Sequence, residues 1–182
     1  FYVFILIMKI CSFEGNEMEI KTADANDAKE IAKINVATWK VAYKDLLPEA
    51  YLAQRTADDK RVEGVRASIG SGVGIWIKAV DNGKIIGYLA GGEARDENFG
   101  FEHEVYAVYV LHQYWGKGAG RALFDAFKKK IKGKGFYLYA LRGNKQALKF
   151  YNKLGGIENS AFDKKITNKD GLMLDEVFIG FN

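Results

Sequence analysis

Apolar residues recur at helical spacing in the first third of the chain. Between residues 31 and 41 they return every three or four positions, which predicts an amphipathic helix over residues 24–43 with Asp24 as its N-cap. The segment "PEAYLAQRTADDKRVEGVRAS" follows it. Pro48 suits the first turn of a second helical stretch, and we expect that stretch to break near Thr56.

Later runs are rich in β-branched and aromatic residues and are bounded by glycine and asparagine, a pattern typical of strands. The turn "DNG" separates two of these runs and predicts a hairpin. The expected strands cover residues 18–23, 73–80, 84–92, 101–111 and 135–141, followed by two closing strands around "TNKDG". Two more helices are expected, one ending near residue 132 and one running from an Asn144 N-cap to Gly155 or Gly156.

The resulting order, β-α-α-β-β-β-α-β-α-β-β, combines antiparallel hairpins with one parallel crossover. It predicts a single α/β domain, of the α+β kind, built on one mixed sheet. Residues 1–17 are interpreted as an N-terminal extension ahead of a domain at 18–182. The first eight residues are apolar, but a membrane span needs about 20, and the flanks of a signal peptide are absent. An extra strand or a dimer contact built from residues 1–7 is the alternative.

The amino-acid composition gives limited information about the binding partners of the protein. The chain has 182 residues and a formal net charge of +4, which suits a polyanionic ligand such as a phosphorylated cofactor but does not by itself indicate nucleic acid. Cys11 is the one cysteine, so no internal disulfide forms and we expect a reducing, cytoplasmic setting. His103 and His112 are the only histidines, so no metal site is expected.

Three glycines lie close together in "HQYWGKGAGRALF", between an expected strand and an expected helix. The first N–H groups of a helix lack partners and bind anions, and Gly116, Gly118 and Gly120 allow a phosphate to approach them. Lys117 and Arg121 add positive charge. The spacing is neither that of a P-loop nor the Gly-x-Gly-x-x-Gly of dinucleotide sites.

The pattern that fits is Gln113-x-x-Gly116-x-Gly118, and with it the sequence resembles the GCN5-related N-acetyltransferase (GNAT) superfamily. Four blocks carry the resemblance, in the family's order: "ATWKVAYKDLLPEAYL", "EVYAVYVL", "QYWGKGAGRAL" and "NKQALKFYNKLGG". The likeness spans roughly residues 18–180. Gly156 departs from the pattern, because the family usually has Phe there, and we expect one weaker packing contact.

The resemblance implies a mostly antiparallel sheet of six or seven strands, with helices on both faces and a splay between the fourth and fifth strands. Acetyl-CoA would lie in that splay, with its pyrophosphate on the glycine turn and its pantetheine arm paired to the fourth strand. A backbone N–H near Val108 would face the thioester oxygen. The implied cofactor-binding residues are Val108, Tyr109, Val110, Gln113, Gly116, Lys117, Gly118, Ala119, Gly120, Arg121 and Asn144. Asn144 is also interpretable as a plain N-cap.

Tyr151 matches the tyrosine often proposed to protonate the leaving thiolate; the alternative is a core aromatic beside Phe150. With a free pKa of about 10 against about 8.5 for a thiol, full transfer is uphill by about 2 kcal/mol. A hydrogen bond to the thiolate, or a lowered tyrosine pKa, is therefore the favoured role. Glu104 matches the family's general base, with Glu102 as a second candidate and a water chain as a third; an exposed charge at the strand mouth is the alternative.

The acceptor side is less defined. An acidic rim would attract a cationic amine, although a solvated loop explains the same residues. The rim comprises Glu93, Asp96, Glu97, Glu102 and Glu104. Trp39 and Tyr43 would line the acceptor pocket or simply belong to the core. The basic run 128–135 is interpreted as a solvated helix end rather than a site for the 3′-phosphate of coenzyme A.

The sequence thus predicts an acetyl-CoA-dependent N-acetyltransferase that moves the acetyl group directly to a primary amine of a small molecule or peptide. No covalent enzyme intermediate, metal, nucleic acid or membrane partner is expected, and homodimerisation stays open. Two alternatives remain: a non-catalytic acyl-CoA sensor with the same fold, and a nucleotide-binding module, which the glycine spacing disfavours.

Overall fold

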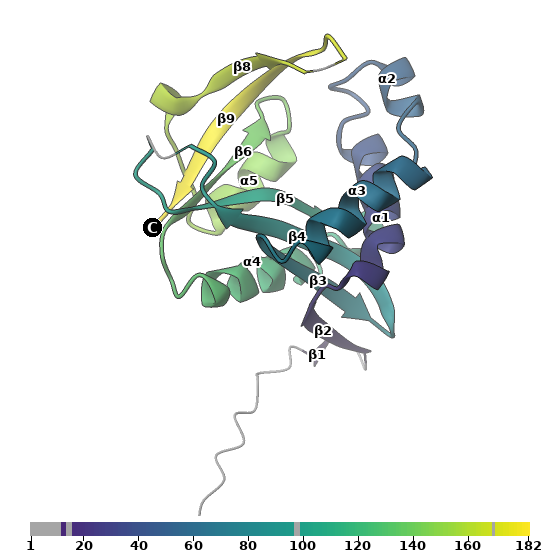
Figure 1. Cartoon of the computed structure of the whole chain (residues 1–182). Coiled ribbons are helices and arrows are strands. Elements are labelled where there is room, and N and C mark those ends of the chain that lie inside the picture. The colour runs from purple at the N-terminus through teal and green to yellow at the C-terminus, as the bar shows by residue number, and fades with distance from the viewer. Residues whose placement is uncertain (1–11, 14–15, 97–98, 169) are drawn as a thin grey trace, which may run out of the picture.

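The computed structural model of the chain, shown in Figure 1, describes residues 12–13, 16–96, 99–168 and 170–182. The expected contact or strand at residues 1–7 lies outside them. The strands are β1 (Ser12–Phe13), β2 (Asn16–Thr22), β3 (Ile75–Asp81), β4 (Lys84–Glu93), β5 (His103–Val110), β6 (Phe136–Leu141), β7 (Ile157–Glu158), β8 (Lys164–Thr167) and β9 (Met173–Phe181). The α-helices are α1 (Ala28–Ala42), α2 (Glu49–Ala53), α3 (Asp59–Gly70), α4 (Ala119–Lys130) and α5 (Lys145–Lys153).

Local signals place most of these elements where the sequence predicts them. Asp24 forms a capping box with Asp27 at the short 3₁₀ turn that leads into α1. The second helical stretch does break, because α2 ends at Ala53 and α3 begins beyond Asp58, whose carboxylate accepts the Arg61 N–H at 2.9 Å. The strands on either side of the "DNG" turn pair as a hairpin.

All the described strands join one sheet, in the order β1-β2-β3-β4-β5-β6-β9-β7, with β8 paired to the other part of β9. Only the β5–β6 pair in the described chain is parallel; the other pairs are antiparallel. The fold is the mixed, mostly antiparallel α/β sheet that the sequence predicts. Its nine strands exceed the predicted six or seven because β1 and β7, each two residues long, also pair.

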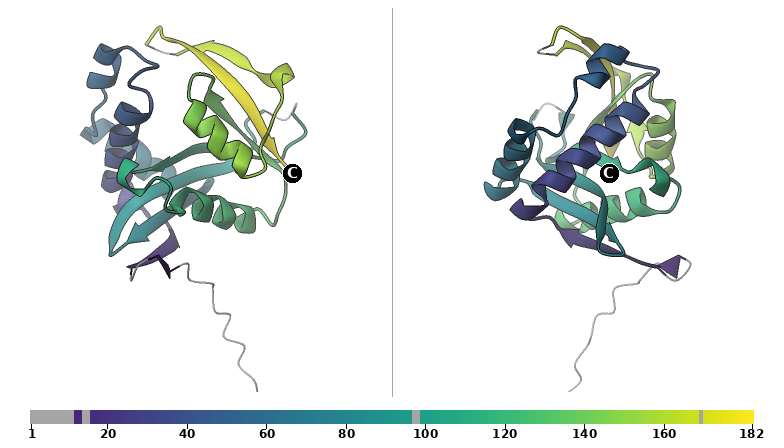
Figure 2. Two further views of the ribbon diagram at one scale, coloured as in Figure 1. Left: turned by 180° about the vertical axis from the view of Figure 1, so that it is seen from behind. Right: turned by 90° about the vertical axis from the view of Figure 1, so that its right-hand side faces the viewer.

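Helices cover both faces of this sheet, as Figures 1 and 2 show. On one face α4 and α5 pack against the strands through Leu123, Phe124, Phe127 and Tyr151. On the other face α1 and α3 pack against β4, with Ile31 and Ile34 buried beside strand residues. In the described part of the chain, no helix has the length and apolar character needed to cross a membrane.

Gly156 departs from the family pattern for a packing reason that the sequence does not reveal. A Cβ at Gly156 would lie 2.6 Å from Ile179 Cγ2 and 2.8 Å from Phe181 Cζ. Both side chains are almost fully buried. The last strand therefore fills the space beside α5, and the expectation of a weakened contact at Gly156 is wrong.

Candidate active site

The parallel pair β5–β6 is very short. Only His103 and Glu104 pair with Phe136 and Tyr137, and beyond them the two strands separate. A cavity of about 420 Å³ opens in the gap, with α4 and α5 at its margin and the end of α1 across it. The predicted splay between the fourth and fifth expected strands, β5 and β6, is therefore present.

The glycine turn lies at one end of this cavity, and two of its glycines are required by backbone conformation. Gly116 has φ 75° and Gly118, the N-cap of α4, has φ 87°. Such angles are strained for residues with a side chain. Ala122 donates to the Gly118 oxygen at 3.0 Å, so the N–H groups of the three preceding helix residues lie ahead of the first helical bond.

Gly120 serves a different purpose. A Cβ there would lie 2.8 Å from Phe150 Cζ, so the missing side chain lets α4 approach α5. Gly118, Ala119, Gly120 and Arg121 all line the cavity. Two predicted cofactor residues are absent from its lining. Gln113 is exposed on the 3₁₀ turn His112–Tyr114, and Lys117 is also exposed, with its Nζ 5.5 Å above the Tyr114 ring.

The edge of β5 presents main-chain groups to the same cavity. Leu111 N–H donates to Ile86 O in β4 at 2.9 Å. Because N–H and C=O groups alternate in direction along an antiparallel strand, those of Val108 and Val110 point away from β4, toward the gap. The Val110 carbonyl accepts the Trp115 indole N–H at 2.6 Å, whereas no partner for the Val108 N–H occurs among the described residues.

Two residues of α5 complete this side. Asn144 is its N-cap and accepts the Ala147 N–H at 3.1 Å, which confirms the cap, and it also lines the cavity. Tyr151 lines the cavity as well, and its hydroxyl makes no hydrogen bond within the described chain. Burial, with a smaller contribution from Tyr109, raises the pKa of Tyr151. The expectation of a lowered pKa is therefore wrong, while the hydrogen-bonding role stays open.

On the α1 side, aromatic residues surround the hydroxyl of Tyr109. The Trp39 indole N–H donates to it at 2.8 Å, and Tyr43 packs edge-on against Trp39 at 4.7 Å between ring centroids. Burial raises the pKa of Tyr43 and of Tyr109. Tyr43 and Tyr109 line the 420 Å³ cavity, but Trp39 belongs to a neighbouring one.

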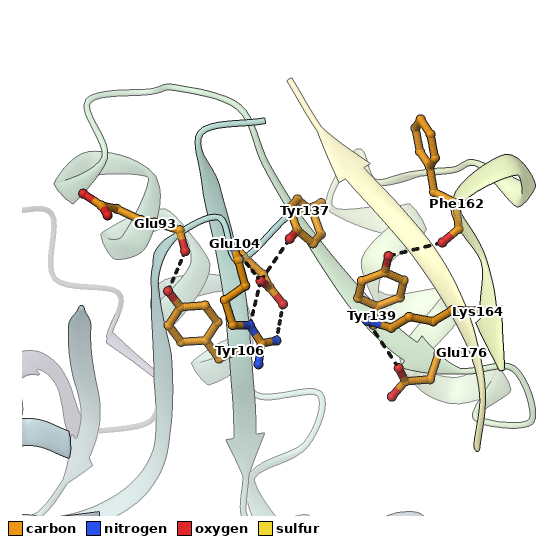
Figure 3. Close-up of polar contacts among 9 residues, drawn as sticks. Glu93, Glu104, Tyr106, Tyr137, Tyr139, Phe162, Lys164 and Glu176 are labelled. Carbon is orange, nitrogen blue, oxygen red and sulfur yellow. Dashed lines mark hydrogen bonds and ion pairs between the residues drawn. The ribbon is translucent and has the colours of Figure 1, made fainter. Parts of the chain in front are cut away.

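Glu104 lies at the point where β5 and β6 part, as Figure 3 shows. Its side chain is almost fully buried and is held by the Arg95 guanidinium through both carboxylate oxygens, while the Tyr137 hydroxyl donates to it at 3.0 Å. Burial favours a higher pKa, but the bonds and charge of Arg95 lower the pKa of Glu104 overall. Glu104 does not line the cavity, so these contacts favour a positioning role over that of a base.

Among the described residues, no carboxylate of the expected acidic rim lines either cavity. Glu102 is exposed and ion-paired with Lys134, whose bond lowers the pKa of Glu102. The Glu93 backbone oxygen accepts the Tyr106 hydroxyl at 2.6 Å. Neither residue lines either cavity, and Glu97 lies outside the described residues.

Glu176 on β9 does not line either cavity, but its charge reaches residues that do, and sequence reasoning did not single it out. It pairs with Leu141 of β6 across the sheet, and its carboxylate lies 3.9 Å from Lys164 Nζ (Figure 3). Burial, opposed by the charge of Lys164, raises the pKa of Glu176. Its charge acts on Tyr43 and on Tyr109, which line the cavity. No motif marks it, because its position depends on the return of β9 beside β6.

No cluster of histidine, cysteine, aspartate and glutamate suited to a metal ion occurs among the described residues. The cavity instead combines free main-chain N–H groups at a helix start, an unpaired strand edge and a buried tyrosine. This donor set fits a phosphate-bearing thioester better than a metal ion.

Comparisons with known proteins show the family to which the chain belongs. The family model described as "Acetyltransferase (GNAT) family" matches residues 30–156. An uncharacterised N-acetyltransferase of Bacillus subtilis (strain 168), YuaI, is 33% identical over 104 residues, which span 57% of this chain and 58% of that relative. The chain thus matches little more than half the length of this curated relative.

Solved structures share the fold at lower identity. The PaiA N-acetyltransferase of Thermoplasma acidophilum, solved with coenzyme A, has a TM-score of 0.63 and 18% identity, covering 90% of this chain and 99% of that one. The yncA structure from Salmonella typhimurium, solved with acetyl-CoA, has a TM-score of 0.65 and 22% identity, covering 91% and 93%. With the family match over more than half of its residues, the chain belongs to the GNAT acetyltransferase family.

Replacing Glu104 by Gln should lower the free energy of unfolding by about 1–2 kcal/mol at pH 7, because the charged bond to Arg95 is lost from a buried position. The lowered pKa means that the contribution of Glu104 is complete above its ordinary pKa, near 4.5, and disappears as pH falls through the folded value. Urea unfolding of both proteins from pH 7 to pH 3 measures this, and the difference should shrink toward acid pH.

Glu102→Gln is the matched control for this measurement, because its ion pair with Lys134 is exposed on both sides. We expect it to leave the unfolding midpoint almost unchanged. Equal effects of the two substitutions would contradict the role assigned to Glu104.

Proposed function

We propose that the protein is an N-acetyltransferase that transfers the acetyl group of acetyl-CoA directly to a primary amine. The observation that carries the proposal is the convergence, in one cavity, of a glycine turn with free N–H groups, the unpaired edge of β5 and the hydroxyl of Tyr151. The acetyltransferase domain would occupy residues 18–182, with β1 and the first residues of β2 extending its sheet, and would work in a reducing, cytoplasmic setting.

The donor's pyrophosphate would be held by the α4 N-terminus, where the positive end of the helix dipole and the N–H groups after Gly118 favour an anion. Arg121 lines the cavity at that point and supplies a cation. The pantetheine arm would lie along β5 as an added strand, bonded to main-chain groups near Val108. Asn144 would contact the arm while it caps α5.

Gly118→Ala should raise the Kd for coenzyme A at least tenfold, because a side chain at φ 87° disturbs the turn that presents the N–H groups. Isothermal titration calorimetry measures it. Gly83→Ala is the matched control, since Gly83 also has positive φ (75°) and open space around the added Cβ, but lies in the β3–β4 hairpin. A similar loss of affinity in both variants would argue against the phosphate site.

The chain's own groups would then stabilise the charges that develop during transfer. The Val108 N–H, directed into the gap, would donate to the thioester oxygen as negative charge builds on it. Tyr151 would donate a hydrogen bond to the departing sulfur. With its pKa raised, the Tyr151 hydroxyl stays protonated at neutral pH, so it stabilises the thiolate as a donor and does not surrender its proton.

Tyr151→Phe should reduce kcat by about 10–100-fold while the Kd for coenzyme A changes little, because it removes one hydrogen bond to a charged sulfur and keeps the ring. Steady-state thiol release and direct binding measurements separate the two quantities. Unchanged kcat would exclude Tyr151 from catalysis and leave it a core aromatic.

The attacking amine must lose a proton, and Glu176 suits this step better than Glu104 or Glu102. Glu104 is tied to Arg95 with a lowered pKa, and Glu102 is paired with Lys134 at the surface. Glu176, like Glu104, does not line the cavity itself, so it would act only through water. Its charge acts on tyrosines that do line the cavity, and its pKa is raised. We propose that water passes the proton from the amine to Glu176, with Lys164 beside it.

Glu176→Gln should lower kcat/KM for alkylamine acceptors by at least tenfold near pH 7. In the wild type, kcat/KM should fall as pH drops through the raised pKa of Glu176, because the protonated carboxyl accepts no proton. That acid limb should be lost in the variant. A pH–rate profile that keeps its acid limb in Glu176→Gln would place the base elsewhere.

The alternative hypothesis, a non-catalytic acyl-CoA sensor, predicts different results in the same assays. It predicts coenzyme A binding that is sensitive to Gly118→Ala but no thiol release with any amine. Tyr151 lines the cavity, and its hydroxyl has no hydrogen-bond partner in the described chain, which favours the enzyme.

A further inference from the structure

A second cavity, of about 260 Å³, adjoins the first on the α1 side of the sheet. Tyr106, Ala107 and Tyr109 of β5 line both cavities, so the two are separated by the same short stretch of strand. The second cavity also brings together Arg55, which follows α2, and Arg61 of α3. Two guanidinium groups in one small cavity indicate an affinity for anions.

Arg55 is held in place by neutral groups. Its guanidinium lies 3.6 Å above the centre of the Trp39 ring and donates to Asn35 Oδ1 at 3.3 Å. The Asn35 amide in turn donates to the Tyr88 hydroxyl at 3.0 Å. Arg55 Nε is buried and has no hydrogen-bond partner in the described chain. The cation is thus fixed in direction while part of its donor capacity is unused.

Arg61 is less enclosed than Arg55, and its charge helps to lower the pKa of the exposed Asp58 carboxyl. Its Nε donates to the Thr56 carbonyl at 2.8 Å. Asp58 accepts the backbone N–H of Arg61, but the two side chains form no ion pair within 4.0 Å. Both arginines act on the buried Tyr88: burial raises the pKa of Tyr88, and the charges of Arg55 and Arg61 oppose this rise. Both arginines and Tyr88 line this cavity.

Arg55 and Arg61 differ from half of the arginines of the chain because they form no ion pair with a carboxylate in its described part. Of the six arginines in the sequence, Arg66, Arg95 and Arg142 form ion pairs with carboxylates. Arg55, Arg61 and Arg121 have no carboxylate partner within 4.0 Å in the described part of the chain, and all three line a cavity. Arg121 faces the proposed pyrophosphate site, which leaves Arg55 and Arg61 for a second anion.

We propose that the acceptor carries an oxyanion, either a carboxylate or a phosphate, that Arg55 and Arg61 bind in the second cavity. The inference rests on the proposed function and specifies its substrate class. With the anion held there, the amine end would pass the shared β5 residues to reach the thioester. It also replaces the expectation of a cationic acceptor, since Glu102 and Glu104 are paired with Lys134 and Arg95.

The test measures thiol release from acetyl-CoA with matched acceptors: an amino acid, its carboxamide, the decarboxylated amine, and an amino alcohol with and without an O-phosphate. We expect wild-type kcat/KM to be at least tenfold higher for an acid than for its neutral partners. The preferred acid, carboxylate or phosphate, identifies the anion. Arg55→Gln and Arg61→Gln should each lower kcat/KM for that acid 10–100-fold, mainly through KM, and change the neutral amines less than threefold.

Lys60→Gln is the matched control, because it removes one positive charge from the same helix at an exposed position outside the cavity. It should leave every acceptor unaffected. The Kd for coenzyme A and the unfolding midpoint report whether the arginine variants remain folded. Arg55→Lys, which keeps the charge without the planar fork, should recover part of the activity toward the acid.

The outcomes separate the two proposals. If neutral amines are acetylated as well as the acids, or if Arg55→Gln lowers both classes equally, the anion site is wrong and the proposed function stands. If coenzyme A binds but no acceptor releases thiol, the proposed function fails, and the acceptor site fails with it.

Discussion

β5 and β6 lie side by side for two residue pairs and then separate, and the 420 Å³ cavity opens where they part. Main-chain groups inside a protein normally have partners, because each unpaired one costs about 1–3 kcal/mol. A strand edge without a neighbouring strand therefore favours any ligand that pairs with it. Glu104, bonded to Tyr137 across the two strands, fixes where the separation begins. The gap between β5 and β6 is consequently a feature of the fold itself.

The gap joins two surfaces with different chemistry. On the α4 and α5 side lie the N–H groups after Gly118 and the hydroxyl of Tyr151, which suit an anionic thioester donor. On the α1 side lie aromatic rings and the guanidinium of Arg55, which suit an acceptor. Because the sheet separates these surfaces everywhere else, a donor and an acceptor bound from opposite faces meet only between β5 and β6.

Charge at the site is determined by pairing more than by composition. The carboxylates of Glu102 and Glu104 contribute little net field, because Lys134 and Arg95 neutralise them at short range. Glu176 keeps a raised pKa because burial outweighs the charge of Lys164. A group of acidic residues in a sequence therefore does not by itself predict the sign of the electrostatic potential at the acceptor site.

The sequence by itself determined the features that depend on neighbouring residues. Gly118 marks the turn before α4, and Asn144 caps α5, since φ angles and caps are set within a few positions of the chain. Tertiary structure alone decided the rest. The partners of Glu104 are one example, because Arg95 and, from 33 positions away, Tyr137 both bond to its carboxylate. Gly156 has no room for a side chain because the last strand returns beside it. Such contacts join distant segments, and no local pattern encodes them.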